Sequence, residues 1–257
     1  TTTHATTGDV LLSGNSVNGS YNIALANDRV LSINQVGDGM LTGVISGTRA
    51  SLIKQGAGAL NLMGANTYTG GTTISAGTLQ VGDATTTGNL GSGNIVNNAT
   101  LVFNHSGAYF LGNVSGNITG TGNVTVISTN NNLTIDRNIT LTGSNSLIKL
   151  IAGANLAANN TTGNVTLNNT VSTSSTGAII VYAGSPVTIN TTTLMGKMAG
   201  ATGAVKYKTY NATLSNLSSA VGGTRNFFFR MQPNVTLTGG NVTATKVYDG
   251  TTTANAT

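Results

Sequence analysis

Few side chains in this 257-residue sequence could perform acid–base, nucleophilic or metal chemistry. The chain has six acidic residues, all of them aspartate, two histidines, His4 and His105, and no cysteine. A pair of glutamates, a Cys/His zinc site, a thiol nucleophile and a disulfide framework are therefore excluded. The aspartates lie at least ten residues apart, most of them beside glycine in turn sequences: Asp9, Asp28, Asp38, Asp83, Asp136 and Asp249. We expect no catalytic residue, no metal site and no cofactor, and we predict that the chain is not an enzyme.

Two short segments carry side chains that could contact a ligand or a partner instead. In a strand, the segment 206–210 would place Lys206, Lys208 and Tyr210 on one face, because side chains alternate with period two. A basic face with a tyrosine fits an anionic polysaccharide or a phosphate surface. The residues fit better an exposed strand face on which lysines prevent edge pairing.

The second segment consists of Phe227, Phe228 and Phe229, three of the five phenylalanines in the chain. In a strand, two rings would point to one face and one to the other, so both faces would be apolar. We expect a structural role, in which this strand closes the end of a stack of repeats or is covered by a following domain. A hydrophobic patch for a receptor is the alternative.

The charge pattern narrows the classes of partner. Charged residues make up 7% of the chain, and 11 basic against 6 acidic residues give a net charge of +5. The basic residues are scattered rather than clustered, so we expect no nucleic-acid partner. The longest apolar stretch, residues 178–183, is far shorter than the roughly 18 residues of a membrane-spanning helix, so we expect no membrane span in this segment.

The elements that must position these residues are short strands. A pattern of apolar residue, threonine, apolar residue recurs along the chain, and it places both apolar side chains on one face of a half-buried strand. Clusters of glycine, asparagine and serine separate these strands and suit close turns. The pattern occurs at Val124–Val126, Leu133–Ile135, Ile139–Leu141, Val165–Leu167, Val187–Ile189 and Val235–Leu237. The chain is therefore predicted to be all-β, with five aliphatic side chains expected to point inward: Val126, Leu133, Ile135, Leu141 and Leu167.

Two architectures fit strands at this spacing, an antiparallel sandwich and a right-handed parallel β-helix, also called a β-solenoid. A meander needs two-residue Asn-Gly or Asp-Gly turns between paired strands, and most connections here are of another kind, which favours the β-solenoid. At about twenty residues a turn the chain would form about twelve turns, with asparagine ladders at the corners. Its Thr-x-Thr segments, such as Thr119–Thr121 and Thr140–Thr142, are not expected to share one turn-length period, which argues against an ice-binding face.

The segment from Gly56 to Gly82, GAGALNLMGANTYTGGTTISAGTLQVG, resembles the passenger-associated repeat of bacterial autotransporters. Its alternation predicts three strands, around Leu60 and Leu62, Thr72 and Ile74, and Leu79 and Val81, with residues 66–71 as the turn between the first two. The resemblance implies a large secreted protein with a β-helical shaft. The export route, autotransporter or two-partner, stays open.

The segment 246–253 resembles the start of the modules named after their Tyr-Asp-Gly motif. Such modules recur in filamentous-haemagglutinin-like adhesins and in biofilm-matrix proteins. We therefore expect a solenoid shaft over residues 1–245 and the entry to a following Tyr-Asp-Gly module at 246–257, with the chain continuing beyond Thr257.

Together the two resemblances imply a structural segment of a secreted bacterial cell-surface adhesin or extracellular matrix fibre that mediates attachment, aggregation or biofilm formation. The expected partners are copies of the chain itself, neighbouring modules, or surface glycans and other polysaccharides. Asn-x-Ser/Thr triplets, such as that at Asn117, are formal glycosylation acceptors that also arise from composition alone. The alternative from another class is a polysaccharide-processing β-helix enzyme, which would need converging acids.

Overall fold

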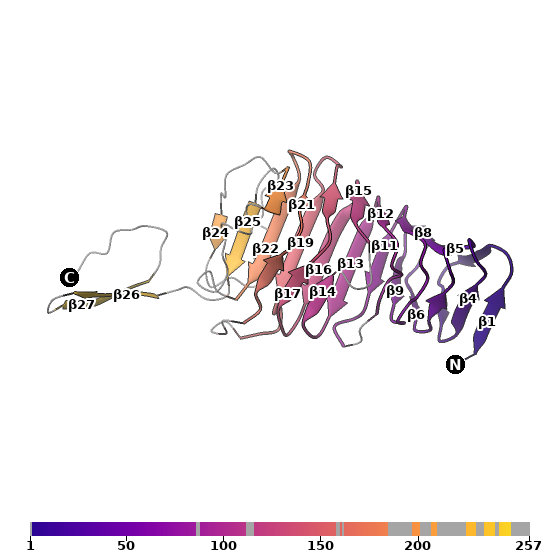
Figure 1. The fold of residues 1–257 in the computed structure, drawn as a ribbon, viewed down its shortest axis with the longest axis horizontal. Helices are drawn as coiled ribbons and strands as arrows, with labels where there is room; N and C mark the ends of the chain where they lie inside the picture. The colour runs from indigo at the N-terminus through magenta and orange to yellow at the C-terminus, as the bar shows by residue number, and fades with distance from the viewer. Residues whose placement is uncertain are drawn as a thin grey trace.

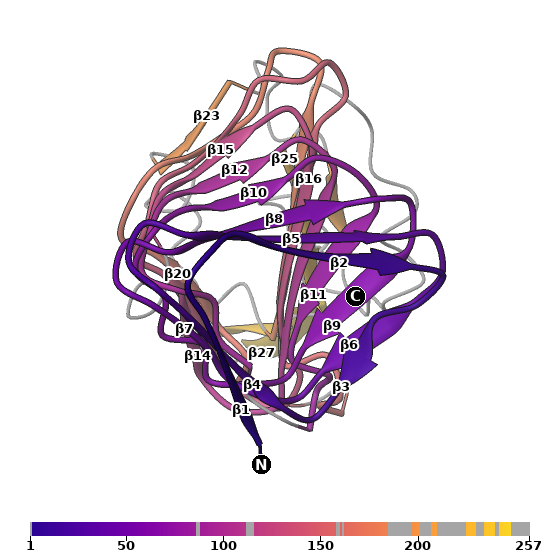
Figure 2. The same ribbon diagram turned by 90° about the vertical axis from the view of Figure 1, so that its right-hand side faces the viewer.

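The chain folds into stacked parallel strands with almost no helix (Figure 1). The computed structural model describes residues 2–85, 88–111, 116–157, 160, 162–184, 197–200, 207–209, 225–229, 234–239 and 242–247. Within these residues three walls of parallel strands enclose one apolar core, and the end view in Figure 2 shows the chain winding from wall to wall. The predicted all-β parallel solenoid is confirmed.

The two larger walls are single sheets in which every pair of neighbouring strands is parallel. The nine-stranded sheet contains, in spatial order, β2 (Val10–Gly14), β5 (Val30–Gln35), β8 (Ser51–Gln55), β10 (Thr72–Ile74), β12 (Ile95–Asn97), β15 (Ile118–Gly120), β18 (Ile139–Leu141), β21 (Val171–Ser172) and β23 (Met198–Ala199). The ten-stranded sheet contains β3 (Asn18–Gly19), β6 (Gly39–Leu41), β9 (Ala59–Leu62), β11 (Thr78–Val81), β13 (Thr100–His105), β16 (Asn123–Ser128), β19 (Leu147–Ala152), β22 (Ala178–Ala183), β25 (Arg225–Phe229) and β24 (Tyr207–Thr209).

The third wall is made of two shorter parallel sheets. The first contains β1 (Thr3–Thr6), β4 (Asn22–Leu25) and β7 (Ile45–Ser46), and the second contains β14 (Tyr109–Leu111), β17 (Leu133–Ile135) and β20 (Val165–Leu167). Each turn of the solenoid thus alternates short strands with corners, as the spacing of the Gly, Asn and Ser clusters predicts.

Successive turns are in register, and their length grows along the chain. Val10 pairs with Leu31 and Leu31 with Leu52, a step of 21 residues each time. Ile139 pairs with Val171, a step of 32 residues. The longer turns are one reason why the nine-stranded sheet has nine strands where about twelve turns were expected.

The alternating strands bury their apolar residues as predicted. Leu133 and Ile135 are fully buried, whereas Thr134 between them is only half-buried on the outer side. Leu167 is buried and Thr166 is exposed on the adjacent strand. The inward positions predicted at Val126 and Leu141, like these, belong to the single core cluster that runs through the solenoid.

Near its C-terminal end the ten-stranded sheet is buried on both faces. Every residue of β22 is buried, which explains why residues 178–183 form the longest apolar run. The outer face carries a second apolar cluster that includes Ile151, Ile180, Tyr182 and Phe228.

A separate antiparallel hairpin is formed by β26 (Asn234–Gly239) and β27 (Val242–Val247). The pattern at Val235–Leu237 therefore belongs to this hairpin and not to a parallel turn, because period-two alternation specifies a face but not a pairing partner. A domain boundary between residues 245 and 246 would divide β27. The pattern at Val187–Ile189 lies outside the described residues.

Candidate functional site

The basic segment predicted as a contact surface is described only in part. Lys206 and Tyr210 lie outside the described residues, whereas Lys208 lies in β24. There it is the register partner of Phe227 in β25, so the two predicted contact segments are neighbours in one sheet. Their role in ligand or partner contact stays a prediction.

The three phenylalanines alternate across β25 as the sequence predicts. Phe227 and Phe229 point into the solenoid core, with ring centroids 6.3 Å apart and ring planes 12° apart. Phe228 points outward and joins the second apolar cluster with Ile180 and Tyr182. All three side chains are buried, which agrees with the structural role favoured for them.

Two of the aspartates, Asp9 and Asp38, link successive turns of the solenoid. The carboxylate of Asp9 accepts a hydrogen bond from the amide of Val30 at 2.9 Å, and Asp38 accepts one from the amide of Ala59 at 2.9 Å. In each case acceptor and donor lie in successive turns. These acids are therefore used in stacking and do not converge on one site.

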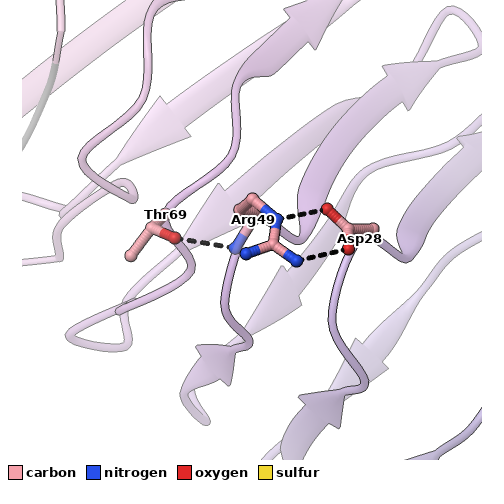
Figure 3. Close-up of polar contacts among 3 residues, drawn as sticks. All are labelled: Asp28, Arg49 and Thr69. Carbon is pink, nitrogen blue, oxygen red and sulfur yellow. Dashed lines mark hydrogen bonds and ion pairs between the residues drawn. The ribbon is translucent and has the colours of Figure 1, made fainter.

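Asp28 and Arg49 form the ion pair drawn in Figure 3. The Arg49 guanidinium donates from Nε to Oδ1 at 2.5 Å and from Nη2 to Oδ2 at 2.6 Å, and the amide of Arg49 donates to the Thr69 hydroxyl at 2.7 Å. The hydrogen bond from Arg49 is the main reason why the pKa of Asp28 is lowered. Asp28 and Arg49 have φ angles of 61° and 55°, so two successive turns make the same left-handed corner.

A ladder of asparagines runs along one corner of the solenoid. The Oδ1 atom of Asn94 accepts from the amide of Asn117 at 3.1 Å, that of Asn117 from the amide of Asn138 at 3.2 Å, and that of Asn138 from the amide of Thr170 at 3.1 Å. Each asparagine directly precedes a strand of the nine-stranded sheet. The predicted ladder is present, in the form of side-chain to main-chain bonds, and it gives the triplets at Asn117 and Asn138 a structural use.

Several buried polar side chains were not predicted from the sequence. Gln35 accepts from the amide of Val17 at 3.0 Å and donates to the carbonyl of Ala59 at 2.7 Å, so it links three turns. The ammonium group of Lys54 donates to the carbonyls of Gln55 and Gly56, and burial lowers its pKa. The alternation places Gln35 and Lys54 at inward positions of β5 and β8, but it does not show the hydrogen-bond partners that make burial there possible.

Within the predicted repeat, the turn at residues 66–71 is itself partly in the core. Tyr68 is fully buried, its hydroxyl lies 2.7 Å from that of Thr72, and burial raises its pKa to about 12. Asn66 accepts from the amide of Ile45 at 2.8 Å and donates to the carbonyl of Asn89 at 2.7 Å, which clamps three turns. The three strands predicted on either side of this turn are β9, β10 and β11.

The Thr-x-Thr segments are stacked, contrary to expectation. Thr119 pairs with Thr140, 21 residues later, so the segments at 119–121 and 140–142 share one turn-length period. The two threonines share the outer face of the nine-stranded sheet with Ser172, the partner of Thr140. The sequence shows no single fixed repeat length that would reveal this stacking, because the length of the turns varies along the chain.

Among the described residues, no group of three or more His, Cys, Asp or Glu side chains could hold a metal ion. Within the part of the chain that the structure describes, no helix is long and apolar enough to cross a membrane.

Comparison with known proteins matches the segment singled out in the sequence. Residues 52–81 match the family described as passenger-associated-transport-repeat. The chain is 52% identical over 58 residues to the adhesin BmaC autotransporter of Brucella suis biovar 1 (strain 1330). That stretch is 23% of this chain and 2% of the relative, so the match covers a small part of that protein. No solved structure matches the chain.

The matched family segment contains β9, β10 and β11, the buried side chains of Lys54 and Tyr68, and the clamp formed by Asn66. The matched segment thus contains side chains that link one turn of the solenoid to the next. The match confirms the resemblance and supports a secreted, cell-surface location. The chain is a parallel β-solenoid whose residues 52–81 match the passenger-associated-transport-repeat and which is similar, over 58 residues, to an autotransporter adhesin.

Proposed function

We propose that the chain is a structural, non-enzymatic segment of a bacterial cell-surface adhesin or extracellular matrix fibre, which contributes to attachment, aggregation or biofilm formation. The observation that carries the proposal is the passenger repeat at residues 52–81 inside an uninterrupted stack of parallel strands. In a parallel stack the main-chain amide and carbonyl groups of each turn form hydrogen bonds with the next turn. The stack is therefore a stiff spacer that can be built from small, uncharged residues.

The polar side chains support a structural rather than a catalytic role. Asp9, Asp38 and the pair Asp28 and Arg49 bridge successive turns. A polysaccharide-processing enzyme would need acids that converge on one face, with one carboxyl poised to give a proton and another to activate water or attack. We also propose that the Tyr-Asp-Gly segment after β27 opens a further module, with the hairpin of β26 and β27 as the join.

The test displays the chain on the surface of a bacterium that neither aggregates nor attaches. Cells that carry the chain are expected to attach to surfaces or to aggregate, and cells that display Ile135→Asp are not, because a charge in the core disrupts the solenoid. Attachment and aggregation no greater than those of the empty host would contradict the proposal. So would release of sugar from pectin or alginate by the purified chain.

A further inference from the structure

We infer that the outer face of the nine-stranded sheet is a contact surface for a second copy of the same chain. This inference rests on the proposed function, and it assigns the self-association of the chain to a defined surface. The outward positions at the centre of the strands run from Leu11 on β2 to Ala199 on β23, and register places them in one row. Every residue in that row is Leu, Ile, Val, Ala, Ser or Thr.

The strands of this sheet contain a single charged residue, Lys54, whose side chain is buried in the interior. The outer face of the sheet is therefore neutral in a chain of net charge +5. Two copies that meet through this face bring no like charges together, whereas the ten-stranded sheet carries Lys149 at an outward position. Because the face is uncharged, two copies of it can meet without electrostatic repulsion.

Two of the hydroxyl groups on this face, those of Thr119 and Ser172, contact acceptors within the sheet. The Thr119 hydroxyl lies 3.5 Å from the carbonyl of Ile95, and the Ser172 hydroxyl lies 3.4 Å from the carbonyl of Ile139 and 3.3 Å from the Thr140 hydroxyl. Covering these two hydroxyls therefore costs less than covering hydroxyls bonded to water alone. Two of the exposed large apolar side chains, Leu11 and Val96, lie on the same row and gain from being covered.

These properties favour a second protein copy over a glycan. The strands of the sheet hold no aromatic side chain on which a sugar ring could stack. Rows of small Ser, Thr and Val side chains instead suit face-to-face packing of two sheets about 10 Å apart. Nine strands about 4.8 Å apart, each about 10 Å long, offer a contact area of roughly 400 Å² in each copy. An interface of this area is weak, and the presence of many copies on one cell surface strengthens it.

The symmetry of such a contact makes it testable. In a two-fold interface the central element faces its own copy. The fifth of the nine strands is β12, and its outward residue is Val96, which is 39% exposed. Val96→Lys would place two lysines against each other, and Val96→Asp two aspartates. An equal mixture of the two variants would place opposite charges together.

The experiment is sedimentation of the full chain over a range of concentrations. Wild type is expected to associate reversibly, each Val96 variant at least tenfold more weakly, and the mixture close to wild type. Met40→Lys is the matched control, since Met40 is 45% exposed and outward on the ten-stranded sheet, and it should associate like wild type. The inference is overturned if wild type stays monomeric, if the mixture fails to recover, or if Met40→Lys weakens association as much as Val96→Lys.

A second pair guards against misfolding of the Val96 variants. Strands β10 and β15 flank β12. We place the two-fold axis parallel to the strands and through β12, which puts Thr73 of one copy opposite Thr119 of the other. Thr119→Lys should weaken association and the added Thr73→Asp should restore it, whereas no effect of either change overturns the inference. A wild-type chain that stays monomeric in solution, while cells that display it still attach to surfaces, would reject this inference and leave the proposed function standing.

Discussion

The asparagine ladder should stabilise the solenoid by a measurable amount at each rung. Asn117→Ala removes the Oδ1 atom that accepts from the amide of Asn138 and leaves the bond from the Asn117 amide to Asn94 in place. Asn117→Asp keeps an acceptor oxygen at the same position and is therefore the matched control. The comparison isolates one hydrogen bond between two turns.

The size of the effect follows from the exposure of the ladder. Asn94, Asn117 and Asn138 are all exposed, so water replaces part of each lost bond. A net loss of about 0.5–1.5 kcal/mol is expected for one rung. In a chain of this size, a change of 1 kcal/mol corresponds to about 2–4 °C in melting temperature. Replacing all three asparagines by alanine should lower stability by about 1.5–4.5 kcal/mol if the rungs act independently.

The assay is urea unfolding at pH 7, followed by the circular dichroism of the strands. The free energy of unfolding should fall for Asn117→Ala and stay near wild type for Asn117→Asp. The reasoning is refuted if the free energy of unfolding falls equally in the alanine and aspartate variants, because the acceptor oxygen would then play no part in stability. It is equally refuted if the triple alanine variant unfolds at the wild-type urea concentration.

Three further predictions concern the core, the pH response and the left-handed corner. Leu133→Ala should lower the free energy of unfolding by about 2–5 kcal/mol and Thr134→Ala by less than about 1 kcal/mol, and equal shifts would contradict the assigned faces. Burial lowers the pKa of His105 to about 4, so the unfolded chain binds more protons than the folded one between about pH 6.5 and pH 4. Stability should therefore fall by up to about 3 kcal/mol over that range as pH decreases, and His105→Gln should remove this part of the slope. Arg49→Gly should melt above Arg49→Ala, because Arg49 has a φ of 55° and glycine adopts it without strain, and the reverse order would show that the corner carries no strain.

The sequence predicts the strands and their faces well because both depend on local alternation. Leu133, Ile135 and Leu167 could be assigned to the core from their neighbours alone, and the structure buries all three. The passenger repeat was recognisable for the same reason, since its residues follow one another without insertion. In these segments the local pattern and the long-range packing agree.

Features that depend on contacts between turns could not be predicted. Lys54 and Gln35 are charged or polar residues at inward positions, and only the carbonyls and amides of neighbouring turns explain why they are buried there. Tyr68 occurs in a turn sequence and yet lies fully in the core. The hairpin of β26 and β27 shows the same limit, because the apolar-threonine-apolar pattern is identical in parallel and antiparallel strands. Turn length also varies, which hid the stacking of Thr119 on Thr140.

The account depends most on the claim that successive turns stack as parallel strands in the register described. The chain has no cysteine, so a pair can be introduced without competing thiols. Val102 and Thr125 are register partners on β13 and β16, and neighbouring strands lie about 4.8 Å apart, within reach of a disulfide. Gln80 pairs with Val102 and is therefore two strands from Thr125, about 9.6 Å away and too far to be bridged.

Oxidation of the dilute protein, followed by mass spectrometry, measures which pair closes within one chain. An intramolecular disulfide is predicted for Val102→Cys with Thr125→Cys, and none for Gln80→Cys with Thr125→Cys. A disulfide in the second variant and none in the first would contradict the parallel register and, with it, the solenoid.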